Sequence, residues 1–178
     1  MKVFVTGVAG QLGHDVMNEL ASRGYVGVGT DLAESYNGIQ DGTYVTTAEY
    51  VSLDITNSEA VMDTIKSVKP DVVVHCAAWT AVDLAEDEDK QEKVKAINVG
   101  GTQNIANACK EIDAKMVYIS TDYVFDGQGT TPWQPDCKDY KPLNVYGETK
   151  LGGELAVSNT LLKILYCSYC VGIWKERE

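Results

Sequence analysis

The sequence lacks the features that mark several large classes of protein. It contains no apolar run of the roughly 18 residues that a membrane-spanning helix needs, and its first residues lead at once into a strand-like segment. We therefore expect neither a membrane span nor a secretory signal. Basic residues are also scarce, 15 against 26 acidic ones, and the formal net charge of -11 disfavours nucleic acid or an acidic membrane surface as a partner.

Spacing typical of a disulfide framework is also missing. The five cysteines are Cys76, Cys109, Cys137, Cys167 and Cys170. Reduced thiols in a cytoplasmic protein are the simplest interpretation. The last two form a C-x-x-C pair, but a single pair without further ligands is a weak sign of a metal or redox site. We predict no metal, and the length of 178 residues suits one domain with a substantial core.

A glycine-rich turn follows the first predicted strand. The strand covers residues 2–6, the turn reads G-V-A-G-Q-L-G, and helical periodicity then runs to Gly24. Strand, glycine turn and helix in this order are typical of a dinucleotide site, where the helix N-terminus binds phosphates. The alternative is a glycine turn without a ligand. The predicted cofactor-binding residues of this turn are Gly7, Gly10, Gln11, Leu12 and Gly13.

A carboxylate follows the second predicted strand, which covers residues 25–30 and ends at Asp31. An acidic residue about 20 positions after the glycines binds the adenosine ribose in dinucleotide sites. It would also repel a 2′-phosphate. We therefore expect NADH or NADPH as the cofactor, with NADH favoured; a surface aspartate in a loop is the alternative.

Strands and helices continue to alternate along the chain. We expect strands at residues 50–53, 71–75 and 115–120, and helices from about 57 to 68 and from 90 to 109. The fold class is therefore α/β, a doubly wound, Rossmann-like parallel sheet that binds its ligands at the carboxyl ends of the strands. Four further cofactor-binding residues follow from their places after these strands: Asp54, Ile55, Ala77 and Ala78.

Tyr146 and Lys150 are four positions apart in V-Y-G-E-T-K. On a helix, such residues lie one above the other on the same face. A lysine ammonium beside a phenol lowers its pKa from about 10 toward neutrality, which suits a proton donor to a carbonyl oxygen. By itself the spacing is a weak signal, because a solvated helix face produces it too.

Several motifs together resemble the extended short-chain dehydrogenase/reductases. The resemblance runs from residue 1 to about 161, and its narrower motifs are typical of reductases that act on nucleotide-linked keto sugars. Besides the glycine turn, the motifs are A-A-W-T-A-V-D at 77–83, I-N-V-G-G-T at 97–102, S-T-D-Y-V-F-D-G at 120–127 and N-V-Y-G-E-T-K at 144–150.

The resemblance implies transfer of hydride from the nicotinamide to C4 of a 4-keto-6-deoxyhexose. Tyr146 would donate the proton, and Lys150 would keep it acidic and contact the nicotinamide ribose. Thr121 would hydrogen-bond the substrate oxygen, with Ser120 as the alternative. The residues that the resemblance places in the sugar pocket are Thr121, Asp122 and Tyr123.

Three further positions need separate interpretation. Asn98 stands where the superfamily keeps a structural or proton-relay asparagine. His75 and Cys76 stand where Asn-Ala is usual, which we expect to alter packing more than chemistry. His75 could act as a base, but a lone histidine at a buried strand end is more often structural.

Two other functions stay open. The chain could be a non-catalytic NAD(P)-binding regulatory subunit, or a nucleotide-sugar epimerase or dehydratase of the same superfamily. Retention of Thr121, Tyr146 and Lys150 favours the reductase. Some relatives pair as homodimers around Mg²⁺ held by carboxylates, and Asp15 is the one candidate ligand, so we predict no metal here.

The resemblance ends abruptly near Lys163. We therefore divide the chain into a dinucleotide-binding domain at 1–162 and an aberrant tail at 163–178. One interpretation of the tail is a shift of the reading frame, because the same bases read one position later can encode the segment that the family has there. On this interpretation the substrate-binding region is largely missing and turnover is impaired.

Overall fold

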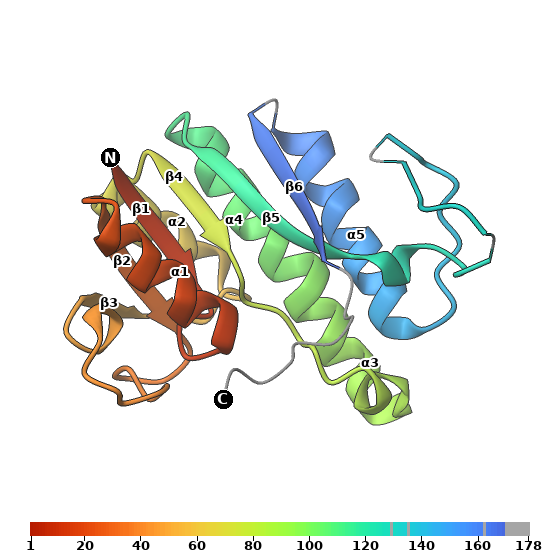
Figure 1. Ribbon diagram of the computed structural model, residues 1–178, viewed down its shortest axis with the longest axis horizontal. Helices are drawn as coiled ribbons and strands as arrows, with labels where there is room; N and C mark the ends of the chain where they lie inside the picture. Colours follow the sequence, from red (N-terminus) through yellow and green to blue (C-terminus); the bar gives the residue numbers. More distant parts are fainter. Residues whose placement is uncertain (129, 135, 162, 170–178) are drawn as a thin grey trace.

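The computed structural model describes residues 1–128, 130–134, 136–161 and 163–169. In these residues a single parallel sheet has the strand order β3-β2-β1-β4-β5-β6 (Figure 1). The strands are β1 (Lys2–Thr6), β2 (Val26–Asp31), β3 (Glu49–Ser52), β4 (Val72–His75), β5 (Lys115–Thr121) and β6 (Ile164–Tyr169). The prediction of a doubly wound parallel sheet is confirmed.

Helices cover both faces of this sheet (Figure 1). The helices are α1 (Gln11–Ser22), α2 (Ser58–Val68), α3 (Glu88–Lys95), α4 (Thr102–Glu111) and α5 (Val145–Thr160). One face carries α1, and the opposite face carries α2, α4 and α5. The crossover through α1 leads from β1 to β2 in one direction along the sheet, whereas the crossovers through α2, α4 and α5 lead to β4, β5 and β6 in the other direction. Because such crossovers are right-handed, the two directions place their helices on opposite faces. Each face has its own apolar core; one is centred on Val3, Val5, Val8 and Met17, the other on Phe4, Ile65, Ile105 and Met116.

The helix predicted at 90–109 is present but is not a regular α-helix throughout. A π-helical segment, Ala96–Gly101, separates α3 from α4. Gly101 lies against Ile55 so closely that an added Cβ would stand 2.6 Å from Ile55 Cδ1. The glycine thus lets this segment approach the end of β3, and π-helical turns of this kind often occur at functional sites.

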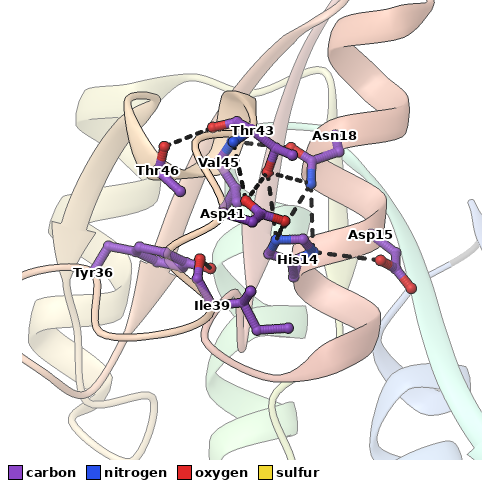
Figure 2. A network of polar contacts seen from close by, with 9 residues as sticks. All are labelled: His14, Asp15, Asn18, Tyr36, Ile39, Asp41, Thr43, Val45 and Thr46. Atoms are coloured by element: carbon purple, nitrogen blue, oxygen red, sulfur yellow. Dashed lines mark hydrogen bonds and ion pairs between the residues drawn. The ribbon is translucent and has the colours of Figure 1, made fainter.

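A polar network fastens the connection between β2 and β3 to α1 (Figure 2). His14 is 6% exposed, and its Nε2 lies 3.2 Å from Asp41 Oδ2. Asn18 donates to Thr43 Oγ1 at 2.9 Å and accepts from the Val45 amide at 3.0 Å. Because α1 begins at the glycine turn, the network holds this connection beside the predicted cofactor site.

The last described segment belongs to the sheet. Residues 164–169 pair in parallel with β5, from Met116–Ile164 to Thr121–Tyr169. Part of the predicted tail is therefore the sixth strand, whereas Cys170 and the rest of the tail lie outside the described residues. In the part of the chain that the structure describes, no helix is long and apolar enough to cross a membrane.

Candidate functional site

The glycine turn is shaped by close backbone contacts. Gly7 has a φ of 72° and donates its amide to Thr30 O at 2.9 Å. An added Cβ at Gly13 would stand 2.2 Å from Gly7 O, so α1 packs here as only a glycine permits. Gly10 caps α1 without a side-chain hydrogen bond. The amides of the first helical turn are thus left for a phosphate, which fits a dinucleotide.

Asp31 joins the end of β2 to this turn. Its Oδ2 accepts from the Ala9 amide at 3.0 Å, and its Oδ1 accepts from the Leu32 amide at 2.8 Å. Each carboxylate oxygen has a second lone pair, so the side chain can still accept from ribose hydroxyls. The structure therefore brings the predicted ribose ligand and the predicted phosphate turn together.

The residues predicted after β3 and β4 fall into two groups. Ala77 contacts the glycine turn, since an added Cβ at Gly7 would stand 2.7 Å from its amide nitrogen, and the half-buried Ala78 follows it. Asp54 instead accepts from its own turn, from Thr56 N at 2.9 Å and Thr56 Oγ1 at 2.7 Å. Ile55 is 8% exposed and belongs to the core.

His75 is a buried structural residue, as expected. Its Nδ1 lies 2.8 Å from Thr6 Oγ1, and its Nε2 lies 3.1 Å from Thr102 Oγ1. Thr6 Oγ1 also accepts from the Ala77 amide, and Thr102 Oγ1 donates to Asn98 O. Burial, together with the charge of Lys150, lowers the pKa of His75 to about 3. The ring is therefore neutral and joins β1, β4 and the segment around Asn98.

The side chain of Asn98 holds three segments together. It accepts from the Trp79 amide at 2.8 Å and donates to Thr149 Oγ1 at 3.0 Å. Thr149 Oγ1 in turn donates to Tyr146 O at 3.0 Å. Asn98 thus connects the loop after β4 and the π-helical segment with the first turns of α5.

Tyr146 and Lys150 lie on the buried face of α5, 8% and 5% exposed. Asn144 caps this helix by accepting from Gly147 N at 2.7 Å. The ammonium of Lys150 donates to Ile119 O at 2.6 Å and lies 4.4 Å from the centre of the Tyr118 ring. The predicted helix and its common face are present, but the lysine is directed to β5.

The expectation that Lys150 lowers the pKa of Tyr146 is wrong for this arrangement. Burial raises the pKa of the phenol, a side-chain hydrogen bond with Thr121 lowers it, and Tyr123 and Asp122 raise it further. Burial dominates because the long lysine side chain satisfies its ammonium on the Ile119 carbonyl. Helical spacing places two Cα atoms, but it does not decide which partner a long side chain reaches.

Thr121, rather than Ser120, lies beside the phenol. Thr121 is 1% exposed, and its hydroxyl donates to Asp122 Oδ1 at 3.2 Å. Ser120 instead donates to Glu154 Oε1 on α5. Tyr123 contacts Tyr146 edge to face, with ring centroids 5.6 Å apart. The structure thus groups the three predicted substrate residues around the start of α5.

Glu154 belongs to this region and was missed by the sequence analysis. It lies one helical turn after Lys150; burial lowers the pKa of that lysine, and the Glu154 carboxylate opposes part of this effect. The signal that could have found it is the i, i+4 spacing of Lys150 and Glu154 on one helix face.

Comparison with known proteins gives a consistent result. The family described as RmlD substrate binding domain matches residues 1–167. The dTDP-4-dehydrorhamnose reductase of Escherichia coli (strain K12) is 38% identical over 165 residues, which is 93% of this chain and 49% of that protein. The methionine adenosyltransferase 2 subunit beta of Rattus norvegicus is 34% identical over 88% of this chain and 42% of that protein.

A solved structure agrees with these relatives. The dTDP-4-dehydrorhamnose reductase of Bacillus anthracis str. Ames, in complex with NADP, superposes with a TM-score of 0.76 at 32% identity, over 95% of this chain and 53% of that chain. The chain therefore spans about half the length of the relatives it matches.

Proposed function

The chain belongs to the RmlD substrate binding domain family, and from this we propose that it carries the cofactor-binding part of a dTDP-4-dehydrorhamnose reductase. The reaction passes hydride from NAD(P)H to the C4 ketone of dTDP-4-dehydro-L-rhamnose and yields dTDP-L-rhamnose. The substrate is a nucleotide sugar, and the setting is cytoplasmic. Because relatives are about twice as long, we expect turnover by this chain alone to be impaired.

The observation that carries the proposal is the grouping of Thr121 and Tyr146, with Lys150 one turn away, at the carboxyl edge of the sheet. Thr121 hydrogen-bonds the phenol, and both side chains are more than nine-tenths buried. The same edge carries the glycine turn, whose uncapped amides suit a pyrophosphate. A hydride source and a proton donor can therefore act on one carbonyl group.

The chain's own residues have separate tasks in this reaction. When bound, NAD(P)H supplies the hydride. Tyr146 keeps its proton at neutral pH, because burial raises its pKa, and it donates that proton to the carbonyl oxygen. Thr121 stabilises the charge that develops on the same oxygen. Lys150 would make Tyr146 a stronger acid on turning its ammonium from Ile119 O to the phenol.

Asp31 supports NADH as the preferred cofactor. Its carboxylate lies against the glycine turn, where a 2′-phosphate would be repelled. The Bacillus anthracis relative is in complex with NADP, so NADPH is also accepted in the family. Titration of the chain with both cofactors by nicotinamide fluorescence tests the preference. Asp31→Asn should bring the two dissociation constants closer together, and an unchanged ratio would contradict this role.

A second candidate is a non-catalytic NAD(P)-binding subunit, favoured by the similarity to methionine adenosyltransferase 2 subunit beta. Oxidation of NADH in the presence of dTDP-4-dehydro-L-rhamnose separates the two functions. The reductase proposal expects slow but measurable oxidation that Tyr146→Phe abolishes. Tight NADH binding with the same background rate in both proteins would favour the binding subunit.

A further inference from the structure

Glu154 lies one turn beyond Lys150 on the same side of α5, and Ser120 donates a hydrogen bond to its Oε1. We propose that Glu154 is a positioning residue: it holds the ammonium of Lys150 against the end of β5 and keeps that ammonium charged. The inference rests on the proposed reductase function and adds a residue to its site. It also predicts a change in the pKa of Lys150, which can be measured without turnover.

Three consecutive residues of β5 attach to two successive turns of α5. Tyr118 Oη donates to Lys150 O at 3.0 Å, and Ile119 O accepts from Lys150 Nζ at 2.6 Å. Ser120 completes the series by its bond to Glu154. The last bond fixes the end of β5 relative to α5, and thereby holds the Ile119 carbonyl at the position where the ammonium finds it.

The surroundings of Lys150 are otherwise unfavourable to a positive charge. Burial lowers its pKa more than Glu154 and Cys76 raise it, and the pKa is about 8. Burial raises the pKa of the Cys76 thiol to about 12 and keeps His75 neutral, and the ring of Tyr118 carries no formal charge. Of the described groups that act on Lys150, Glu154 alone is a carboxylate, so it is the main counter-charge.

Glu154 also connects the site to the loop that precedes α5. Burial raises the pKa of Tyr140, and the charge of Glu154 and a side-chain hydrogen bond with it raise this pKa further. The Tyr140 ring stacks on Phe125, and Phe125 stacks on Trp133 with centroids 4.6 Å apart. Tyr166 of β6 donates to the Glu154 backbone oxygen at 3.1 Å. A purely structural role for Glu154 is therefore the rival interpretation, and the test has to separate the two.

The Glu154→Gln variant removes the charge but keeps an oxygen that can accept from Ser120. With lysines labelled at the ε-carbon, the NMR signal that disappears in Lys150→Met identifies Lys150, and its titration gives the pKa. We expect Glu154→Gln to lower the titration midpoint by about 1 pH unit, the usual effect of one nearby charge. Glu148→Gln, an exposed position on the same helix, is the matched control and should leave the midpoint unchanged.

A midpoint for Glu154→Gln equal to that of the unmodified chain would overturn the inference. Glu154→Asp keeps the charge, so the midpoint of Lys150 should fall much less than in Glu154→Gln. An equal fall of the midpoint in the two variants would also overturn the inference. Should the Gln variant fail to fold, Ser120→Ala replaces it, and an unchanged midpoint there would contradict the positioning.

The pH profile of turnover gives the functional readout. In Glu154→Gln we expect the turnover number at pH 8 to fall about 5-fold, because the charged fraction of Lys150 falls from about a half to about a tenth when the midpoint moves from about 8 to about 7. The turnover number should recover at lower pH, where Lys150 regains its proton, with KM unchanged. A loss that is the same at every pH would indicate structural damage and contradict the role. A shifted midpoint in a chain that never reduces the sugar would contradict the reductase function and leave the effect on Lys150 standing.

Discussion

On the β1–β2 side of the sheet, the predicted cofactor site consists mainly of backbone groups in close contact. On the β5 side, the Tyr146–Lys150 face of α5 consists of buried polar side chains. The first region matches the sequence expectation closely: the added Cβ at Gly13 would stand 2.2 Å from Gly7 O. The second has the expected helix but a different partner for its lysine. Backbone atoms in close contact allow few other conformations, whereas a long buried side chain can reach several hydrogen-bond partners.

Removal of the Tyr146 hydroxyl should produce the largest effect on turnover. A small effect would show that the β5 side does not carry the proton transfer. Tyr146→Phe should reduce turnover by about 10²- to 10⁴-fold, the usual contribution of a general acid. NADH affinity should change little, because the glycine turn is untouched. Steady-state rates and a fluorescence titration measure the two quantities. A variant that keeps most of its turnover would exclude Tyr146 as the proton donor.

A methyl group at Gly13 tests the backbone contact on the other side. Gly13→Ala would meet Gly7 O and Val8 Cα, which cannot rotate away, and should lower the free energy of unfolding by about 1–3 kcal/mol and weaken NADH binding. At Gly100 an added Cβ meets nothing within 4 Å, so Gly100→Ala should stay within about 0.5 kcal/mol. Urea unfolding measures the free energy of unfolding of both variants. Equal losses in the two variants would contradict a special role for the close contact at Gly13.

Acid should destabilise the protein through His75. Its folded-state pKa is about 3 against a reference of 6.5, so below pH 6.5 the unfolded chain binds a proton that the folded chain does not. This contribution is complete above pH 6.5 and is lost as the pH falls toward 3. Between pH 7 and pH 5 we expect a loss of about 2 kcal/mol.

Urea midpoints at the two pH values test this dependence. His75→Asn should show a smaller loss on acidification, because asparagine does not titrate. The same loss in variant and parent would assign the effect to other groups.

The smallest expected effect is the loss of a helix N-cap, which can be compared at Asn57 and Asn144. Asn57 accepts from Ala60 N at 3.1 Å at the start of α2, and Asn144 accepts from Gly147 N at 2.7 Å at the start of α5. Alanine at either position should cost about 1 kcal/mol in thermal unfolding. Only Asn144→Ala should also reduce turnover per folded molecule, because its helical turn carries Tyr146. Equal turnover in both variants would contradict a special role for that turn.

Much of the fold could be predicted because its signals are local. The strand at 2–6 and the helix from about 57 to 68 both depend on residues within a few positions of one another. The π-helical segment could not be predicted, because it depends on Gly101 meeting Ile55 from another part of the chain. The sixth strand lies in the segment that we expected to be an aberrant tail, yet it pairs along β5.

The candidate site divides in the same way. Ser120 and Thr121 could not be distinguished from sequence, because the choice depends on which of them Glu154 of α5 binds. The partners of His75 come from 69 and 27 positions away. No window of sequence contains such pairs, although each residue type was visible from the start.

The sequence by itself determined the order of strands and helices, the glycine turn with Asp31 beside it, and the common helix face of Tyr146 and Lys150. Local sterics and periodicity suffice for these features. Only the tertiary structure decided that Lys150 donates to Ile119 O and that burial raises the pKa of Tyr146. Burial and long-range hydrogen bonds depend on the whole packed chain, because the free energy of a buried charge is set by the groups around it.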